Sequence, residues 1–103
     1  MTAVALAWRN DDRYSGAWKS TGEYTVMGYP GDPGKAPRMT LTIERKGDGW
    51  TVGGINPDFS YPVKEANGQL VRTDDPKLAL LELRGDKLYL LGPPAEFEFS
   101  RQP

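Results

Sequence analysis

The chain contains no cysteine and no histidine. The lack of cysteine excludes disulfides, thiolate nucleophiles, zinc fingers and iron–sulfur clusters. The lack of histidine removes the usual general base and the commonest metal ligand. The acidic pairs Asp11-Asp12 and Asp74-Asp75 do not have the spacing of a calcium-binding loop. The sequence therefore predicts no metal site, no cofactor and no enzymatic activity.

An excess of one charge and long apolar runs are also lacking. The 103 residues include 13 basic and 14 acidic side chains, mixed along the whole chain. Nucleic-acid-binding proteins usually carry a clustered basic patch, and a membrane span needs roughly 18 apolar residues in a row. We therefore expect no nucleic-acid partner and no membrane span. Met1 to Ala7 contains two Ala-x-Ala patterns like the end of a signal peptide, so the compartment stays open between cytoplasm and periplasm or secretion.

Helix signals are scarce, because twelve glycines and nine prolines interrupt the chain. Strand signals are regular: Met39, Leu41 and Ile43 alternate with polar residues, as in a half-buried strand. Asn67-Gly68 and Arg84-Gly85-Asp86 are hairpin turns by composition. The expected strands are 14–21, 23–27, 38–45, 50–55, 59–64, 69–72, 78–83, 87–91 and 96–101. Seven to nine short strands joined by tight turns predict an all-β, antiparallel up-and-down meander that closes into a barrel, with a β-sandwich as the alternative.

Residues 14–103 are expected to form this single β-barrel domain. Residues 1–13 form an N-terminal segment, with a short helix as a candidate, that packs on the barrel or caps it. The alternation places a set of bulky side chains inside the barrel: Trp18, Met39, Leu41, Ile43, Trp50, Val52, Tyr61, Val63, Leu70, Leu78, Leu80, Leu88, Leu90, Phe97 and Phe99. This set is large enough to fill a short barrel and to leave no sizeable cavity.

Gly16-Ala17-Trp18 on the first strand resembles the Gly-x-Trp signature of lipocalins and related calycin barrels. Arg101, near the end of the last strand, occupies the place where those families often have a basic residue that packs on the tryptophan. The resemblance implies that Trp18 and Arg101 close the barrel, where stacking of a guanidinium on an indole contributes about 0.5–2 kcal/mol. Some short bacterial proteins with this kind of barrel inhibit proteases, so the resemblance also permits an inhibitor.

Candidate partner-binding residues come from the two least regular parts of the chain. Gly28 to Pro37 holds three glycines and three prolines, so it is expected to be a loop in which Tyr29 and Lys35 contact a partner or form part of a barrel mouth. Trp8 lies in a polar N-terminal stretch. It either caps the barrel or is an exposed interface anchor, since tryptophan is enriched in binding hot spots.

The hairpin of residues 78–91 is expected to be apolar on both faces. Leu81, Leu83, Tyr89 and Leu91 fall on the face opposite Leu80, Leu88 and Leu90, which suggests a homodimer or cover by the N-terminal segment. The sequence thus predicts a non-enzymatic barrel that binds a protein partner, an inhibitor among the candidates. A carrier of a small apolar ligand at one open barrel end is the alternative, and a structural or accessory domain is the third interpretation.

Overall fold

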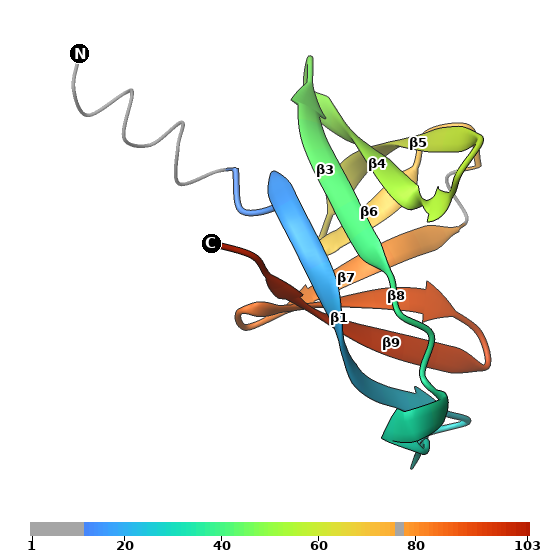
Figure 1. The fold of residues 1–103 in the computed structure, drawn as a ribbon. Helices are drawn as coiled ribbons and strands as arrows, with labels where there is room; N and C mark the ends of the chain where they lie inside the picture. The colour runs from blue at the N-terminus through green and yellow to red at the C-terminus, as the bar shows by residue number, and fades with distance from the viewer. Residues whose placement is uncertain (1–11, 76–77) are drawn as a thin grey trace.

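The computed structural model describes residues 12–75 and 78–103, and it shows an antiparallel sheet that closes on itself (Figure 1). The elements are β1 (Gly16–Val26), β2 (Tyr29–Pro30), the 3-10 helix η1 (Pro33–Lys35), β3 (Thr40–Lys46), β4 (Gly49–Asn56), β5 (Phe59–Ala66), β6 (Gln69–Arg72), β7 (Ala79–Arg84), β8 (Lys87–Gly92) and β9 (Ala95–Arg101). Neighbouring strands pair in the order β2-β1-β3-β4-β5-β6-β7-β8-β9, and β1 also pairs with β9. Eight strands therefore form a closed barrel to which β2 is appended.

The expectation of an all-β meander that closes into a barrel is confirmed, and the sandwich alternative is not observed. We call the pairing of β1 with β9 the seam. It runs antiparallel from Trp18 opposite Arg101 to Val26 opposite Ala95. The candidate N-terminal helix lies outside the described residues, except for its last two positions. Among the described residues, no helix has the length and apolar character needed to cross a membrane.

Strand β1 is one element of 11 residues, although the sequence predicts two strands separated at Gly22. Its register against β9 shifts between Ser20, which is opposite Phe99, and Tyr24, which is opposite Phe97. Gly22 lies within this bulge with a φ of 95°, a conformation that favours glycine. The glycine therefore bends the strand where it was expected to end it, and β1 spans the barrel from one end to the other.

Strand β7 corrects the predicted faces of the leucine-rich hairpin. Leu81 pairs with Leu90 of β8 on one side and with Leu70 of β6 on the other. The next pair between β6 and β7 joins Val71 to Ala79. Leu80 is thus an extra residue in a bulge, which moves Leu81 and the residues after it to the other face. Leu81 is fully buried, and Leu83 packs on the core, so the prediction that both lie on an apolar outer face is wrong.

One hydrophobic core lies inside the barrel and joins all the strands except β2. The buried residues are Tyr14, Trp18, Leu41, Ile43, Trp50, Val52, Val63, Leu70, Leu81, Leu88, Leu90 and Phe99. Met39, Ile55, Leu80, Leu83 and Phe97 are partly buried and pack against it. Tyr61 is half-buried, and Leu78, which was expected inside, is 48% exposed. Leu78 is exposed because it precedes β7, in the connection from β6.

Because the strands form a meander, successive connections lie alternately at the two ends of the barrel. The turns β3–β4, β5–β6 and β7–β8 lie at the end where β1 begins and β9 finishes, which we call the plugged end. The connections β1–β3, β4–β5, β6–β7 and β8–β9 lie at the other end, which we call the open end. Figure 1 shows β2 and η1 as an extension of β1 away from the barrel wall at this open end.

Candidate functional site

Residues 12–15 cross the plugged end and are held there by hydrogen bonds to β1, β4, β5 and β9. The indole Nε1 of Trp18 donates to the Tyr14 carbonyl at 2.8 Å, and the indole Nε1 of Trp50 donates to Asp12 Oδ1 at 3.0 Å. The Tyr14 hydroxyl donates to Glu65 at 2.5 Å, and its ring meets the Trp50 ring edge-on with centroids 5.0 Å apart. Tyr14 and Trp18 are both buried, so this segment acts as a plug.

The contact that the calycin resemblance implies is present at the plugged end. The guanidinium carbon of Arg101 lies 4.4 Å from the centroid of the Trp18 ring. The same guanidinium donates to the backbone carbonyls of Ser15 and Arg13. Arg45 stacks on Trp50 in the same way, at 4.4 Å, which the sequence did not indicate. Trp18 and Arg101 therefore tie the first strand, the last strand and the plug together.

Two side chains of the plug have shifted pKa values. Burial, followed by the hydrogen bond to the Glu65 carboxylate, raises the pKa of Tyr14 well above its ordinary value of 10.0. Burial also acts to raise the pKa of Asp12, but hydrogen bonds from Trp50 and Ser15 outweigh it and hold that pKa below 3.8. The plug thus contains an ionised aspartate and a neutral tyrosine at ordinary pH.

The raised pKa of Tyr14 predicts a loss of stability in alkali. Between the ordinary tyrosine pKa of about 10 and the higher pKa of the folded state, only the unfolded chain releases this proton, so folding becomes less favourable as pH rises. The free energy of unfolding is expected to fall by up to about 1.4 kcal/mol per pH unit above pH 10 from this group. Urea unfolding at a series of pH values measures it. Tyr14→Phe should be less stable at pH 7 by about 1–3 kcal/mol because Glu65 loses one of its two donors and keeps only Arg13. The unfolding free energy of this variant should fall less steeply above pH 10. Equal slopes for the two proteins would contradict the assignment.

The open end carries the large apolar side chains that are exposed within residues 12–75 and 78–103. Among the described residues, the exposed large hydrophobics are Val26 (40%), Met27 (74%), Tyr29 (75%), Phe59 (62%) and Leu78 (48%). We call these five residues the rim. Met27, Tyr29 and Leu78 lie in the connections β1–β3 and β6–β7. Val26 ends β1 and Phe59 begins β5, so they border the connections β1–β3 and β4–β5. All three connections lie at the open end. The same number of exposed apolar side chains scattered singly over a surface would be ordinary, but their restriction to one end is not.

The rim includes one of the two residues that the sequence singles out in the long connection. Tyr29 belongs to β2, where it pairs with Val26 of β1, so part of a segment expected to be a loop forms a short hairpin. Lys35 is exposed at the end of η1. Trp8 lies outside the described residues. Val26, Met27, Phe59 and Leu78 were not predicted, because each follows a strand-like pattern and only the position at a strand end exposes it.

Met27 stands out by its backbone as well as by its exposure. With Gly28 it forms the turn between β1 and β2, and its φ is 54°. Asn67 has the same φ in the turn between β5 and β6, and asparagine is a preferred residue for this conformation. A methionine there costs stability and gains no burial, since its side chain is 74% exposed. Backbone strain of this kind clusters at functional sites.

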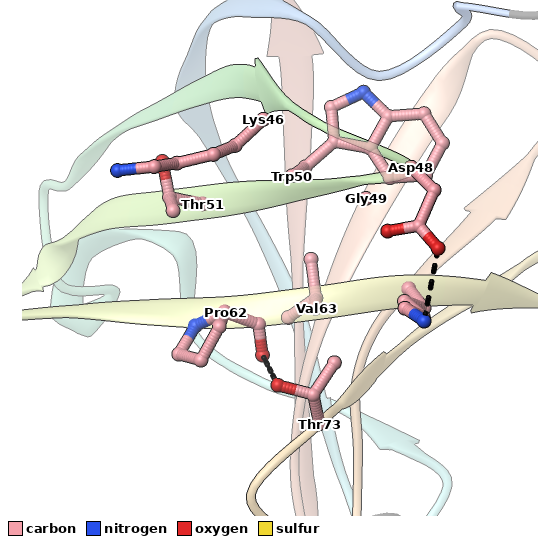
Figure 2. Close-up of a pocket in the computed structure, with 9 residues that line it drawn as sticks. Lys46, Asp48, Gly49, Trp50, Thr51, Pro62, Val63 and Thr73 are labelled. Atoms are coloured by element: carbon pink, nitrogen blue, oxygen red, sulfur yellow. Dashed lines mark hydrogen bonds and ion pairs between the residues drawn. The ribbon is translucent and has the colours of Figure 1, made fainter.

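A separate hollow of about 430 Å³ lies between β4, β5 and their neighbours on the barrel wall (Figure 2). Figure 2 shows Lys46 and Asp48 toward opposite sides of the view, with Thr51 of β4 and Pro62 of β5 on neighbouring strands. Lys64 Nζ lies 3.1 Å from Asp48, and the Thr73 hydroxyl is 3.5 Å from the Pro62 carbonyl. Both partners of the ion pair are largely exposed, so it contributes little stability. Among the described residues that line this hollow, no polar side chain is buried.

The four residues of the predicted self-association surface do not share one face of the β7–β8 hairpin. Tyr89 and Leu91 are half-buried on the outer wall, opposite Glu98 and Glu96 of β9. Leu81 and Leu83 are inside, as described above. Among the described residues, no cluster of three or more acidic side chains has the geometry of a metal site.

No family model matches this chain, and no curated protein or solved structure matches it either. What the barrel does must therefore be inferred from its own two ends. The plugged end is filled by hydrogen-bonded and stacked side chains that stabilise the fold. The open end carries the rim, which has no such role.

Proposed function

We propose that this protein is a non-enzymatic binding module that holds a protein partner against the rim at its open end. The observation that carries the proposal is the restriction of the exposed large hydrophobics of the described residues to that end. Aromatic side chains and methionine are enriched at the centres of protein interfaces, and the rim offers Met27, Tyr29 and Phe59. The strained backbone of Met27 supports the proposal, since selection for stability alone favours asparagine at that turn.

The rim is well suited to binding because packed side chains support it from inside the barrel. Met39, Ile55 and Phe97 pack against the core just inside the open end, and the Tyr24 and Phe97 rings stack with centroids 5.6 Å apart. A short hairpin on such a base loses little conformational entropy when its side chains bind a partner. Because the chain resembles calycin barrels, inhibition of a partner enzyme is the kind of protein binding to test first.

The double variant Met27→Asn/Tyr29→Ser tests the proposal. It is expected to fold with an unchanged or slightly higher melting temperature, because asparagine relieves the turn, and to lose partner binding by at least about tenfold, or 1.4 kcal/mol. The measurement is affinity capture from the native host with the wild type and the variant side by side, followed by titration of the captured protein. If that protein is an enzyme, its activity with and without the barrel tests inhibition.

The matched control is Asn67→Met, which places a methionine at the same backbone conformation on the plugged end. This variant should melt at a lower temperature than the wild type and bind the captured protein equally well. Loss of binding in the control, or its retention in Met27→Asn/Tyr29→Ser, would count against the rim.

A carrier of small apolar ligands is the second candidate, and the half-buried side chains Met39, Ile55 and Phe97 at the open end favour it. An environment-sensitive apolar dye distinguishes the two functions. Stoichiometric, saturable uptake by the native protein supports the carrier, whereas the continuous core predicts weak, unsaturable binding.

A further inference from the structure

Two hollows lie side by side on the outer wall of the barrel next to the rim. The first, of about 290 Å³, is lined mainly by apolar groups, among them Gly28, Leu91, Pro93 and Pro94. The second, of about 340 Å³, is lined by Glu23, Glu96, Glu98, Arg84 and Tyr89, among others. Thr25 and Glu96 line both hollows, so they form one continuous surface that begins beside Met27.

Arg84 is fully engaged by its neighbours in the second hollow. Its two terminal nitrogens donate to the two oxygens of Glu96 at 2.9 and 3.1 Å, and its Nε donates to Glu82. The guanidinium also lies over the Tyr89 ring, 4.5 Å from the centroid. The positive charge of Arg84 therefore offsets Glu82 and Glu96 and not the other two carboxylates of the hollow.

Glu98 is held in place by neutral donors. The hydroxyls of Tyr89 and Thr21 donate to its two oxygens at 2.8 and 2.9 Å. These bonds fix the orientation of the carboxylate and leave its charge uncompensated. Glu23, exposed on β1, forms no ion pair within residues 12–75 and 78–103 either. Among the described residues that line it, the hollow thus has an oriented negative charge, a second one beside it, and no cation other than Arg84.

We propose that the partner contributes an apolar side chain close in sequence to a lysine or arginine. The apolar side chain lies in the hollow lined by Leu91, Pro93 and Pro94. The cation lies against the carboxylates of Glu98 and Glu23. This inference rests on the proposed function and names the chemistry of the partner. A bound ammonium or guanidinium would meet Glu98 already oriented, so little side-chain entropy would be lost on binding. An acidic partner would be repelled by the same wall.

The same charges disfavour a homodimer through this wall, although Tyr89 and Leu91 were predicted to self-associate. A two-fold dimer brings a surface patch against its own copy. Here the uncompensated carboxylates of Glu23 and Glu98 would face the same carboxylates of the second copy. The apolar side chain of Leu91 therefore serves a heterologous partner with a basic residue.

A random-peptide library displayed on phage and selected on the immobilised full chain tests the partner chemistry. The expected result is enrichment of sequences with an aromatic or aliphatic residue within a few positions of lysine or arginine. A selected peptide should bind about tenfold more weakly to Glu23→Gln/Glu98→Gln, and its affinity should fall as salt is raised. The matched control, Glu44→Gln on the outer face of β3, should bind as the wild type does.

Failure of this inference can be distinguished from failure of the proposed function. Enrichment without a basic bias, equal affinity for Glu23→Gln/Glu98→Gln and the wild type, or no selected peptide would overturn the inference. If the captured host protein nevertheless depends on Met27 and Tyr29, the rim remains the binding surface and only the basic partner is wrong. Melting temperatures of both carboxamide variants show whether the wall is still folded.

Discussion

Replacing Trp18 by alanine is expected to lower the free energy of unfolding by about 3–5 kcal/mol, a large part of the 5–15 kcal/mol typical of such domains. Trp18 is 1% exposed and lies where the plug, β1 and β9 meet. The substitution opens a cavity, leaves the Tyr14 carbonyl without its indole donor and removes the ring beneath Arg101. Urea unfolding followed by circular dichroism measures the loss.

Arg101→Met separates the packing of Trp18 from its contact with the guanidinium. This variant keeps an apolar stem over the ring and loses the charge and the bonds to the Ser15 and Arg13 carbonyls, so we expect a loss of about 1–2 kcal/mol. In a protein that already carries Trp18→Ala, Arg101→Met should cost distinctly less, because the two residues act through one contact. Strictly additive losses would show that Arg101 stabilises the seam without Trp18.

Leu81→Ala is expected to cost about 2–5 kcal/mol, while Leu91→Ala costs less than about 1 kcal/mol. Leu81 is fully buried and pairs with Leu90 across the hairpin, whereas Leu91 is on the outer wall opposite Glu96. Thermal and urea unfolding of the two variants compare the same chemical change on the two faces of the barrel wall.

Leu80→Ala is the control for the bulge in β7. Leu80 packs against the core but remains partly exposed, so its truncation should cost less than that of Leu81. A strictly alternating β7, as the sequence predicts, would reverse this order. A larger loss for Leu80 than for Leu81 would therefore place the bulge elsewhere.

The fold was predictable wherever polar and apolar residues alternate cleanly. Leu41 and Ile43 are buried and Thr40, Thr42 and Glu44 are exposed, as their period of two requires. The run from Leu78 to Leu83 has four leucines, and no polar residue alternates with them before Glu82. The sequence pattern therefore does not mark the bulge at Leu80. Local pattern cannot locate a bulge that only the pairing partner, here β6, imposes.

The plugged end was predictable only in part, and the rim hardly at all. Trp18 and Arg101 were identified through a short motif, but the stacking of Arg45 on Trp50 depends on which strands become neighbours. Tyr29 stood out through the prolines and glycines around it. Phe59 and Leu78 lie 19 positions apart in sequence and share the open end only because the meander brings alternate connections together.

The seam also bears on how the chain folds. Every other strand pair joins strands that are consecutive in sequence, or separated only by β2 and η1, so these pairs can form locally and early. The pairing of Trp18 with Arg101 must bring together residues from the two extremes of the described chain, at the full entropic cost of that loop. Until it forms, β1 and β9 each present an unpaired edge to other molecules, so intermediates are prone to aggregate through these two strands.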